Sequence, residues 1–180
     1  MPPKNHNDPI TEIEHLRQSL SKYDRALPPH QLRKFASQLT LSPGQWQSHV
    51  TFHGQHFCYK TLFQSAYFEV NLIGWRPGQI SSIHHHIGSA CCVLVLDGLL
   101  TNRDYRVASE IHLIETVKTD LTCGEVLTRF GTQIHSCGNE QKNVDLTTLH
   151  LYSPPLRPLA ERYLASQRFK SKDRRSEGAT

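Results

Sequence analysis

Residues Gly78–Gly98 read GQISSIHHHIGSACCVLVLDG, and this segment carries the strongest structural signal in the chain. Its second half is an apolar run of strand length, and glycine turns bound the segment at both ends. On an extended strand, residues two apart share a face and lie about 6.6–7 Å apart along the chain. His84 and His86 should therefore point together, and His85 should point away from them.

Comparable runs rich in β-branched, aromatic and aliphatic residues occur on both sides of this segment, with turn residues between them. They are HFCYKTLF (56–63), YFEVNLIGW (67–75), EIHLIETV (110–117), GEVLTRF (124–130) and VDLTTLHLY (144–152). Together with SSIHHH and CCVLVLDG they predict seven or more short strands, which is typical of a β-sandwich or barrel. No helical pattern of sufficient length separates the strands, and this argues against a parallel α/β sheet.

The N-terminal part of the chain has a helical pattern instead. Asp8 can cap a helix in which Pro9 is an early residue. Apolar residues recur at helical spacing in two places: first at Ile10, Ile13, Leu16 and Leu20, and then, after Pro28 and Pro29, at Leu32, Phe35 and Leu39. We therefore expect an all-β core with N-terminal α-helices.

These patterns predict three parts of the chain. A helical segment over residues 1–48 should pack on the barrel, which should occupy residues 49–166, and a basic, disordered tail should cover 167–180. The sheet should end near Pro154 because proline cannot donate to a β-ladder. A closing helix is expected over residues 159–169.

Composition excludes several classes of protein. With 37% apolar and 20% charged residues, the chain is neither a disordered acidic protein nor a membrane protein. No apolar run reaches the ~18 residues of a spanning helix, and the first residues contain no apolar signal core, so we expect a cytoplasmic protein. The five cysteines form no CxxC pair, which argues against a disulfide framework or a zinc knuckle and favours free thiols.

The net charge of +4 does not indicate nucleic-acid binding. The segment Arg168–Arg175 contains five basic residues and one acidic residue, so the excess charge belongs to the tail and the rest of the chain is near neutral. We expect this tail to be solubilising. Neither nucleic acid nor a membrane is expected as a partner, and the chain should be a monomer or a weak homodimer.

His135 is the candidate for a third imidazole beside His84 and His86, because it lies at the end of the strand predicted over 124–130. Three neutral imidazoles without a carboxylate suit Fe, Zn, Cu or Ni by softness, and the donor set alone does not choose among them. The remaining strand histidines are expected to be ordinary surface or hydrogen-bonded residues: His53, His56, His85 and His112.

The final strand adds a second group of polar residues. On the string TTLHLYSPP (147–155), Thr148, His150 and Tyr152 share one face, and Leu149 and Leu151 share the other. A histidine and a tyrosine that point into a barrel each need a hydrogen-bond partner, so they could form a proton-handling pair. The alternative is a polar face in water, with the leucines as the buried side.

The spacing of these residues resembles the two sequence motifs of the cupin superfamily. The first motif matches at Gly78, His84, His86, Cys91 and Gly98, except that Cys91 stands where cupins usually carry a glutamate ligand. The second matches at Gly124, His135 and Asn139, with Phe130 in place of a proline. The resemblance implies a small jelly-roll β-barrel with a metal in its mouth.

Together with SSIHHH, Cys91 and IHSCGN, the string TLHLYSPPL resembles the cysteine dioxygenases, which are cupin enzymes, over about residues 57–156. The resemblance implies an Fe(2+) enzyme that adds both atoms of O2 to a small thiol, turning L-cysteine into its sulfinate. It also implies roles for individual residues. The iron would be held by His84, His86 and His135, with Tyr152 as the active-site tyrosine and His150 and Thr148 as its support.

Three positions leave alternatives open. Cys91 matches the cysteine that forms a thioether with the tyrosine in animal members, so it is either cross-linked to Tyr152 or a small buried hydrophobic residue. Lys60 stands where these enzymes carry a carboxylate-binding arginine, and lysine keeps the charge but lacks the planar fork. Lys60 is thus either a substrate anchor or a solvated residue on a strand edge. His85 replaces the usual middle aspartate.

The substrate therefore stays open between cysteine and another small thiol such as 3-mercaptopropionate. Two further functions also stay open: a cupin enzyme that uses zinc or nickel, and a non-catalytic cupin that binds a small molecule. Enzymes of the zinc or nickel type generally retain the carboxylate ligand that Cys91 replaces, which counts against them.

Overall fold

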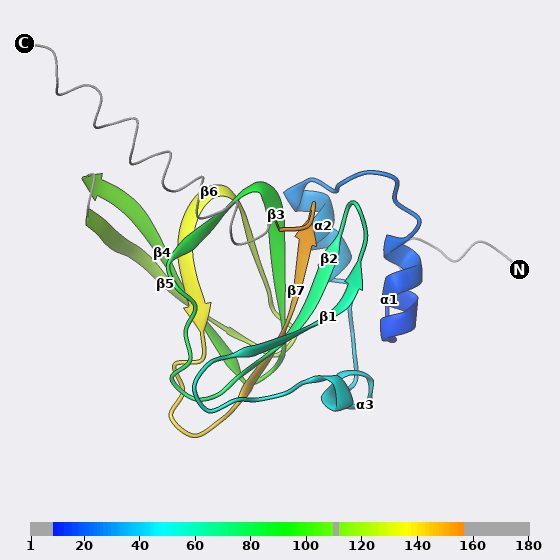
Figure 1. Cartoon of the computed structure of the whole chain (residues 1–180), viewed down its shortest axis with the longest axis horizontal. Coiled ribbons are helices and arrows are strands. Elements are labelled where there is room, and N and C mark those ends of the chain that lie inside the picture. Colours follow the sequence, from blue (N-terminus) through cyan, green and yellow to red (C-terminus); the bar gives the residue numbers. More distant parts are fainter. Residues whose placement is uncertain (1–8, 110–111, 157–180) are drawn as a thin grey trace, which may run out of the picture.

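The computed structural model describes residues 9–109 and 112–156. Most of these residues form a strongly curved, seven-stranded antiparallel sheet (Figure 1). The strands are β1 (Cys58–Gln64), β2 (Glu69–Trp75), β3 (His84–Asp97), β4 (Leu99–Ser109), β5 (His112–Thr122), β6 (Val126–Gly138) and β7 (Leu146–Ser153). Their order across the sheet is β1-β2-β7-β3-β6-β4-β5.

The last strand, β7, lies between β2 and β3, and β3 lies between β7 and β6. These central strands are paired on both edges, and every residue of β7 is buried. A long-range antiparallel arrangement of this kind brings together segments that lie far apart in the sequence. The centre of the sheet is therefore where residues from several parts of the chain can meet on one face.

Helices cover one face of the sheet (Figure 1). They are α1 (Ile13–Leu20), α2 (Pro29–Ala36) and α3 (Pro43–Trp46), followed by the short 3-10 helix η1 (Gln47–His49). Helix α2 packs on β3, β6 and β7, and buries Leu32 and Phe35 against the sheet. The N-terminal helices thus pack on the sheet, and the predicted bounds of the three parts of the chain stay a prediction.

The alternation along β7 separates two hydrophobic clusters. Leu149 and Leu151 join the cluster beneath the helices, whereas Tyr152 belongs to a second cluster on the concave face of the sheet, with Trp75 and Val93. His150 and Thr148 are also buried. The polar face of β7 therefore points into the barrel, and the alternative of a polar face in water is wrong.

Some element boundaries differ from the prediction. Helix α1 begins at Ile13 rather than near Pro9, because the backbone of Ile10 instead bonds to Gln38 and Thr40 beside Leu39. The two runs around the histidines form one strand, β3, and the polar strand β4 was not predicted because its sequence lacks a clear apolar alternation. Asp8, the expected helix over 159–169 and the tail over 167–180 lie outside the described residues.

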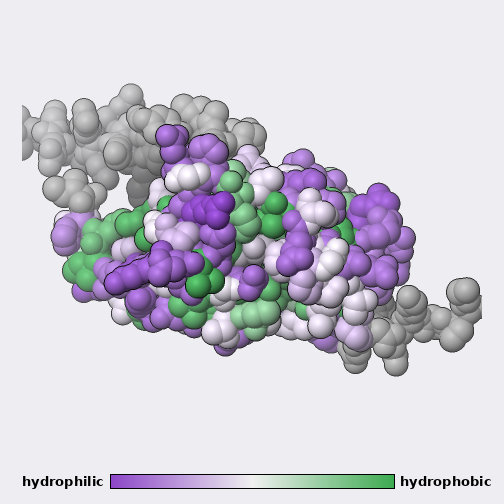
Figure 2. Space-filling model, turned by 90° about the horizontal axis from the view of Figure 1, so that it is seen from below, coloured by the Kyte–Doolittle hydropathy of each residue, from purple (hydrophilic) through white to green (hydrophobic). Residues whose placement is uncertain are grey.

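In the part of the chain that the structure describes, no helix is long and apolar enough to cross a membrane. The face seen in Figure 2 mixes hydrophilic and hydrophobic residues, and hydrophobic groups gather toward the end of the molecule that carries β4 and β5. Exposed apolar side chains of these strands include Val107 and Val117.

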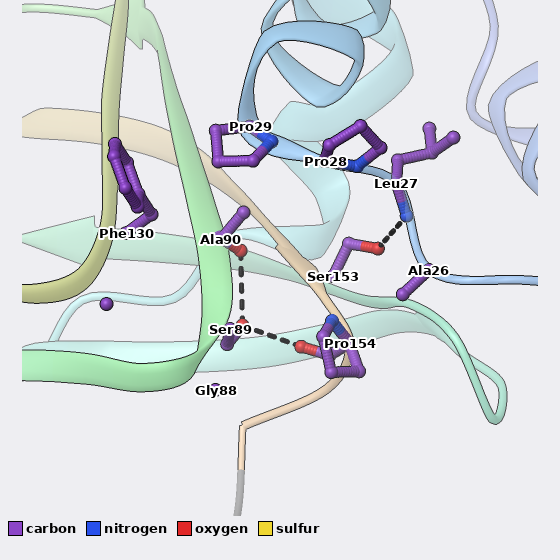
Figure 3. A pocket seen from close by; sticks show the side chains of 11 residues that line it. Ala26, Leu27, Pro28, Pro29, Gly88, Ser89, Ala90, Phe130, Ser153 and Pro154 are labelled. Carbon is purple, nitrogen blue, oxygen red and sulfur yellow. Dashed lines mark hydrogen bonds between the residues drawn. The ribbon is translucent and has the colours of Figure 1, made fainter.

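A shallow hollow of about 410 Å³ opens between the segment before α2 and strands β3, β6 and β7 (Figure 3). Ser153 accepts a hydrogen bond from the backbone N–H of Leu27 at 2.8 Å, and Ser89 donates to the backbone oxygen of Pro154 at 2.6 Å. These bonds satisfy the polar groups of the wall. The lining contains none of the three histidines predicted to bind metal, so the hollow is distinct from the site described below.

Gly138 offers a test of how closely β6 approaches the segment that precedes β3. A Cβ at this position would collide with the backbone oxygen of Gln79 and lie 2.6 Å from the Cα of Ile80. We expect Gly138→Ala to lower the free energy of unfolding by about 1–3 kcal/mol through overpacking. Gly54→Ala, where a Cβ meets nothing within 4 Å, is the control and should change it little. Urea unfolding measures both, and equal stability of the two variants would contradict the close approach.

Candidate metal centre

The pairing of β3 with β6 brings three imidazole rings together. His84 lies directly opposite His135 in the antiparallel register, and His86 follows two residues later on β3. The ring centroids of His84 and His86 are 4.8 Å apart, and His135 lies 4.5 Å from the first and 5.1 Å from the second. The nearest ring nitrogens of the three residues all lie within 4.8 Å of one another, so the predicted convergence is confirmed.

Oxygen acceptors fix which ring nitrogen carries the proton in two of these histidines. Nδ1 of His135 lies 2.8 Å from Oδ1 of the fully buried Asn102, and Nδ1 of His84 lies 2.8 Å from the backbone oxygen of Ser82. An oxygen of this kind can only accept, so both rings carry their proton on Nδ1 and leave the Nε2 lone pair available. Such outer partners are typical of metal-binding histidines.

The electrostatic surroundings keep His135 neutral. Burial, together with the charges of His84 and Arg129, lowers the pKa of His135 to about 3. Nε2 of His135 lies 2.9 Å from Nε2 of His86, so two nitrogen atoms that could bind a metal already lie close together. Neutral, converging imidazoles suit a divalent transition metal of borderline softness. The donor set fits iron, copper, nickel or zinc, and a bound ion of this class would supply Lewis-acid or redox chemistry.

A chain of polar contacts runs beside the histidines along β7. Nε1–H of Trp75 donates to Oγ1 of Thr148 at 2.9 Å, Oγ1 of Thr148 lies 3.0 Å from Nε2 of His150, and Nδ1 of His150 lies 3.2 Å from the hydroxyl of Tyr152. All four residues are buried. The chain satisfies polar groups that would otherwise cost about 1–3 kcal/mol each in this interior.

The first donor determines which group donates in each of these hydrogen bonds. Because the indole of Trp75 can only donate, the Thr148 hydroxyl accepts from it. Among the described residues, the other partner of this hydroxyl is His150. The Thr148 proton therefore goes to Nε2 of His150, and His150 donates from Nδ1 to Tyr152. Burial, followed by the charges of His86 and His84, lowers the pKa of His150 to about 3, so the ring is neutral. The hydroxyl proton of Tyr152 therefore points away from His150.

Tyr152 and Cys91 lie opposite each other in the pairing of β7 with β3, and both are buried. Burial raises the pKa of each group well above its usual value, and the hydrogen bond between the two side chains raises the pKa of Tyr152 further but lowers that of Cys91. Tyr152 also lies near the centre, with its ring centroid 5.7 Å from that of His86. The structure thus brings Cys91, Tyr152 and the three histidines together on the concave face.

Lys60 is not part of this group. Its register partner on β2 is Leu72, whose own partner on β7 is Leu149, so Lys60 belongs to the face that the helices cover. It is exposed, and its Nζ lies 3.0 Å from Nδ1 of His49. A register shift in β1 between Thr61 and Phe63 separates this stretch from the rest of the strand. The expected placement of Lys60 beside the histidines is therefore not observed.

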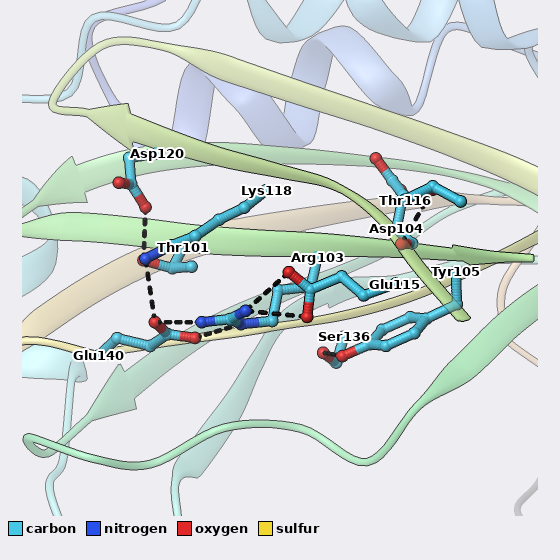
Figure 4. Close-up of polar contacts among 10 residues, drawn as sticks. All are labelled: Thr101, Arg103, Asp104, Tyr105, Glu115, Thr116, Lys118, Asp120, Ser136 and Glu140. Atoms are coloured by element: carbon cyan, nitrogen blue, oxygen red, sulfur yellow. Dashed lines mark hydrogen bonds and ion pairs between the residues drawn. The ribbon is translucent and has the colours of Figure 1, made fainter. Parts of the chain in front are cut away.

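Strand β4 carries an ion pair beside the centre. Its residue Arg103 lies on the other face of the strand, where it binds the carboxylates of Glu115 and Glu140 (Figure 4). Asp104, the next residue along, lies opposite His135 and binds Arg129 of β6 through both carboxylate oxygens, at 2.8 and 2.6 Å. Arg129 in turn lies opposite Cys91.

Sequence reasoning did not identify four residues of this site: Trp75, Asn102, Asp104 and Arg129. Their side chains matter through contacts between different strands, which no local spacing reveals. For Asn102 and Asp104 the strand itself was missed. A lone polar residue within a predicted strand, such as Arg129, is more often solvated than buried.

Comparison with known proteins adds an independent line of evidence. Residues 16–165 match the model of the family described as cysteine dioxygenase type I. Cysteine dioxygenase type 1 from Bos taurus is 26% identical over 120 residues, covering 63% of this chain and 59% of the relative, and the human enzyme is 26% identical over 119 residues, covering 63% and 58%. The matched region thus spans less than two thirds of the length of these relatives.

Solved structures support the fold. A cupin superfamily protein from Desulfitobacterium hafniense has a TM-score of 0.50 at 17% identity, covering 64% of this chain and 92% of that chain. An uncharacterised protein with a double-stranded β-helix domain from Klebsiella pneumoniae has a TM-score of 0.51 at 15% identity, covering 60% and 80%. The family match and the three-histidine cluster together indicate a metal cofactor. The chain belongs to the cysteine dioxygenase type I family, with a cupin fold and a three-histidine site.

Proposed function

We propose that this protein is a non-haem Fe(2+) dioxygenase that adds both atoms of O2 to a small thiol, with L-cysteine converted to cysteine sulfinate. The observation that carries the proposal is the three-imidazole cluster with Tyr152 and its polar chain beside it, in a chain of this family. Neutral donors without a carboxylate suit an ion that must also accept a thiolate. Free cysteines among the described residues agree with a reducing cytoplasm as the location.

Each residue of the site has a role in this proposal. His84, His86 and His135 would hold the iron, which when bound supplies open coordination positions and the redox chemistry for sulfur oxidation. Tyr152 would donate its hydroxyl proton to the bound substrate or dioxygen, while His150 and Thr148 hold that hydroxyl in place. Holding two reactants in the right orientation in one site can lower the activation barrier by about 7–11 kcal/mol. A rigid site at the mouth of the barrel would contribute to the reaction in this way.

Metal content and oxygen uptake test the proposal. We expect the purified wild type to contain iron and to consume O2 with cysteine or 3-mercaptopropionate. Loss of a residue that hydrogen-bonds a metal ligand lowers metal affinity by roughly 10–100-fold. His86→Ala removes a ligand itself, so its metal affinity should fall by more than this, and its oxygen uptake should fall as well. His85→Ala is the matched control, because the ring of His85 is adjacent in sequence but lies outside the cluster. Bound zinc or nickel without thiol-dependent uptake would instead favour the other cupin functions.

The low pKa of His150 predicts an acid-sensitive fold. In the unfolded chain this group takes up a proton near its usual pKa of about 6.5, whereas in the folded chain it does so only at about 3. Its contribution to stability is thus present above pH 6.5 and is lost as the pH falls, by about 1.4 kcal/mol per unit. Between pH 7 and pH 5 the wild type should lose roughly 2 kcal/mol more than His150→Gln in urea unfolding. Identical losses would show that His150 is not held neutral.

The contact between Cys91 and Tyr152 predicts a thioether. Its formation would replace one hydrogen of the thiol and one of the ring by a carbon–sulfur bond, with O2 as the oxidant that takes up both. After turnover with a thiol, part of the wild type should migrate faster on a denaturing gel and lose the mass of two hydrogens. Cys91→Ser should give a single band, and Cys92→Ser, which alters the neighbouring thiol on the other face, should keep both. A single uncross-linked wild-type species would leave Cys91 as a packing residue.

A further inference from the structure

Arg129 is a cation that faces the interior of the barrel next to the histidine cluster. On β6 its neighbour Thr128 contacts Cys92 and accepts from Arg33 of α2, so Thr128 lies on the helix-covered face. Arg129 must then lie on the concave face, in one cross-strand row with Cys91 and Tyr152. Its side chain is only 16% exposed. Its charge also lowers the pKa of His135 and that of Cys91.

The hydrogen bonds of Arg129 occupy only part of its guanidinium group. Nε and Nη2 donate side-on to the two oxygens of Asp104, and Nη1 donates at 2.7 Å to the backbone oxygen of Thr128. A guanidinium group has five N–H donors, so one N–H on each terminal nitrogen remains. These two lie on the end-on edge, which matches a carboxylate in a bidentate contact. Among the described residues, none accepts a hydrogen bond from them.

Asp104 holds the guanidinium group in a fixed orientation. Its backbone oxygen accepts a bond from Thr116 at 3.1 Å on the neighbouring strand (Figure 4). Asp104 lies directly opposite His135 in the pairing of β4 with β6. An arginine clamped in this way loses little further side-chain freedom when its free edge binds an anion. The pair therefore forms a preorganised acceptor for an anionic group beside the histidine cluster.

We propose that Arg129 binds the carboxylate of the thiol substrate, through the end-on edge that Asp104 leaves free, and that it takes the role expected of Lys60. The inference rests on the proposed function, because it places the carboxylate of a small thiol whose sulfur lies at the three-histidine centre. It selects thiols that carry a carboxylate a few bonds from sulfur. Thiols of the same size without that charge should bind without using Arg129.

The experiment compares two thiols that differ only in charge, 3-mercaptopropionate and 3-mercaptopropionamide, together with L-cysteine. Oxygen uptake gives KM and kcat, and anaerobic titration calorimetry of the metal-loaded protein gives binding in the absence of turnover. The variants are Arg129→Gln and Arg129→Lys. Arg129→Gln/Asp104→Asn avoids an unpaired carboxylate in case the single variant folds poorly. Arg76→Gln is the matched control, since it also breaks an arginine–aspartate pair, with Asp145, but outside the site.

We expect Arg129→Gln to raise KM for 3-mercaptopropionate and cysteine by about 10–100-fold, as loss of a charge-assisted bidentate contact does. The constants for the amide should change less than about twofold, Arg129→Lys should fall in between, and Arg76→Gln should match the wild type. An equal loss on acid and amide, or a change in stability alone, would show that the ion pair only joins β4 to β6. A selective effect of Lys60→Ala instead would return the role to Lys60.

Failure of the proposed function gives a different result. If no thiol supports oxygen uptake, the oxidation is wrong, but the binding measurement still decides the role of Arg129. Weaker anaerobic binding of the acid relative to the amide in Arg129→Gln supports the inference without any turnover. Equal binding of acid and amide by the wild type overturns it.

Discussion

The antiparallel pairing of β3 with β6 is the constraint on which the site depends. It places His84 opposite His135, and the same strand carries Cys91 opposite both Tyr152 on β7 and Arg129 on β6. A slip of one residue would turn every side chain of the strand to the other face. From Ala90 to Asp97, β3 is paired with β6 or β7 along both edges, and α2 packs on the strand. The segment with His84 and His86 pairs with β6 alone, through an irregular register, so it depends on this pairing and on the well-supported second half of the strand.

The interior accommodates these polar side chains because most of them bond to one another; among the described residues, the buried Nδ2 of Asn102 has no partner. The indole of Trp75 starts a chain that ends at Tyr152, and Asn102 takes up the remaining proton of His135. Each contact determines both the orientation and the protonation of the next group, since an unmet partner in this environment costs about 1–3 kcal/mol. The same bonds that stabilise the fold therefore leave one hydroxyl proton and two imidazole lone pairs directed to a common point.

Much of this site could be predicted because a strand alternates with a period of two. That rule placed His84 with His86, and Thr148 with His150 and Tyr152, and the structure confirms both sets. It cannot say which strands pair, so the neighbours supplied by β4, Asn102 and Asp104, could not be predicted. The rule also fails where a strand is irregular. Lys60 lies beside a register shift in β1, and a sequence alignment cannot show on which face such a residue lies.

The charge balance of the site links its two proposed binding functions. Three imidazoles bring no negative charge to a divalent ion, and the nearby Arg129 is already paired with Asp104. Such a centre attracts an anion, and proximity to a cation favours the thiolate over the thiol. A substrate that is both thiolate and carboxylate would neutralise the ion with its sulfur while its second charge meets the open edge of Arg129. Neutral ligands and a partly satisfied arginine therefore favour the same substrate: a small thiol with two negative ends.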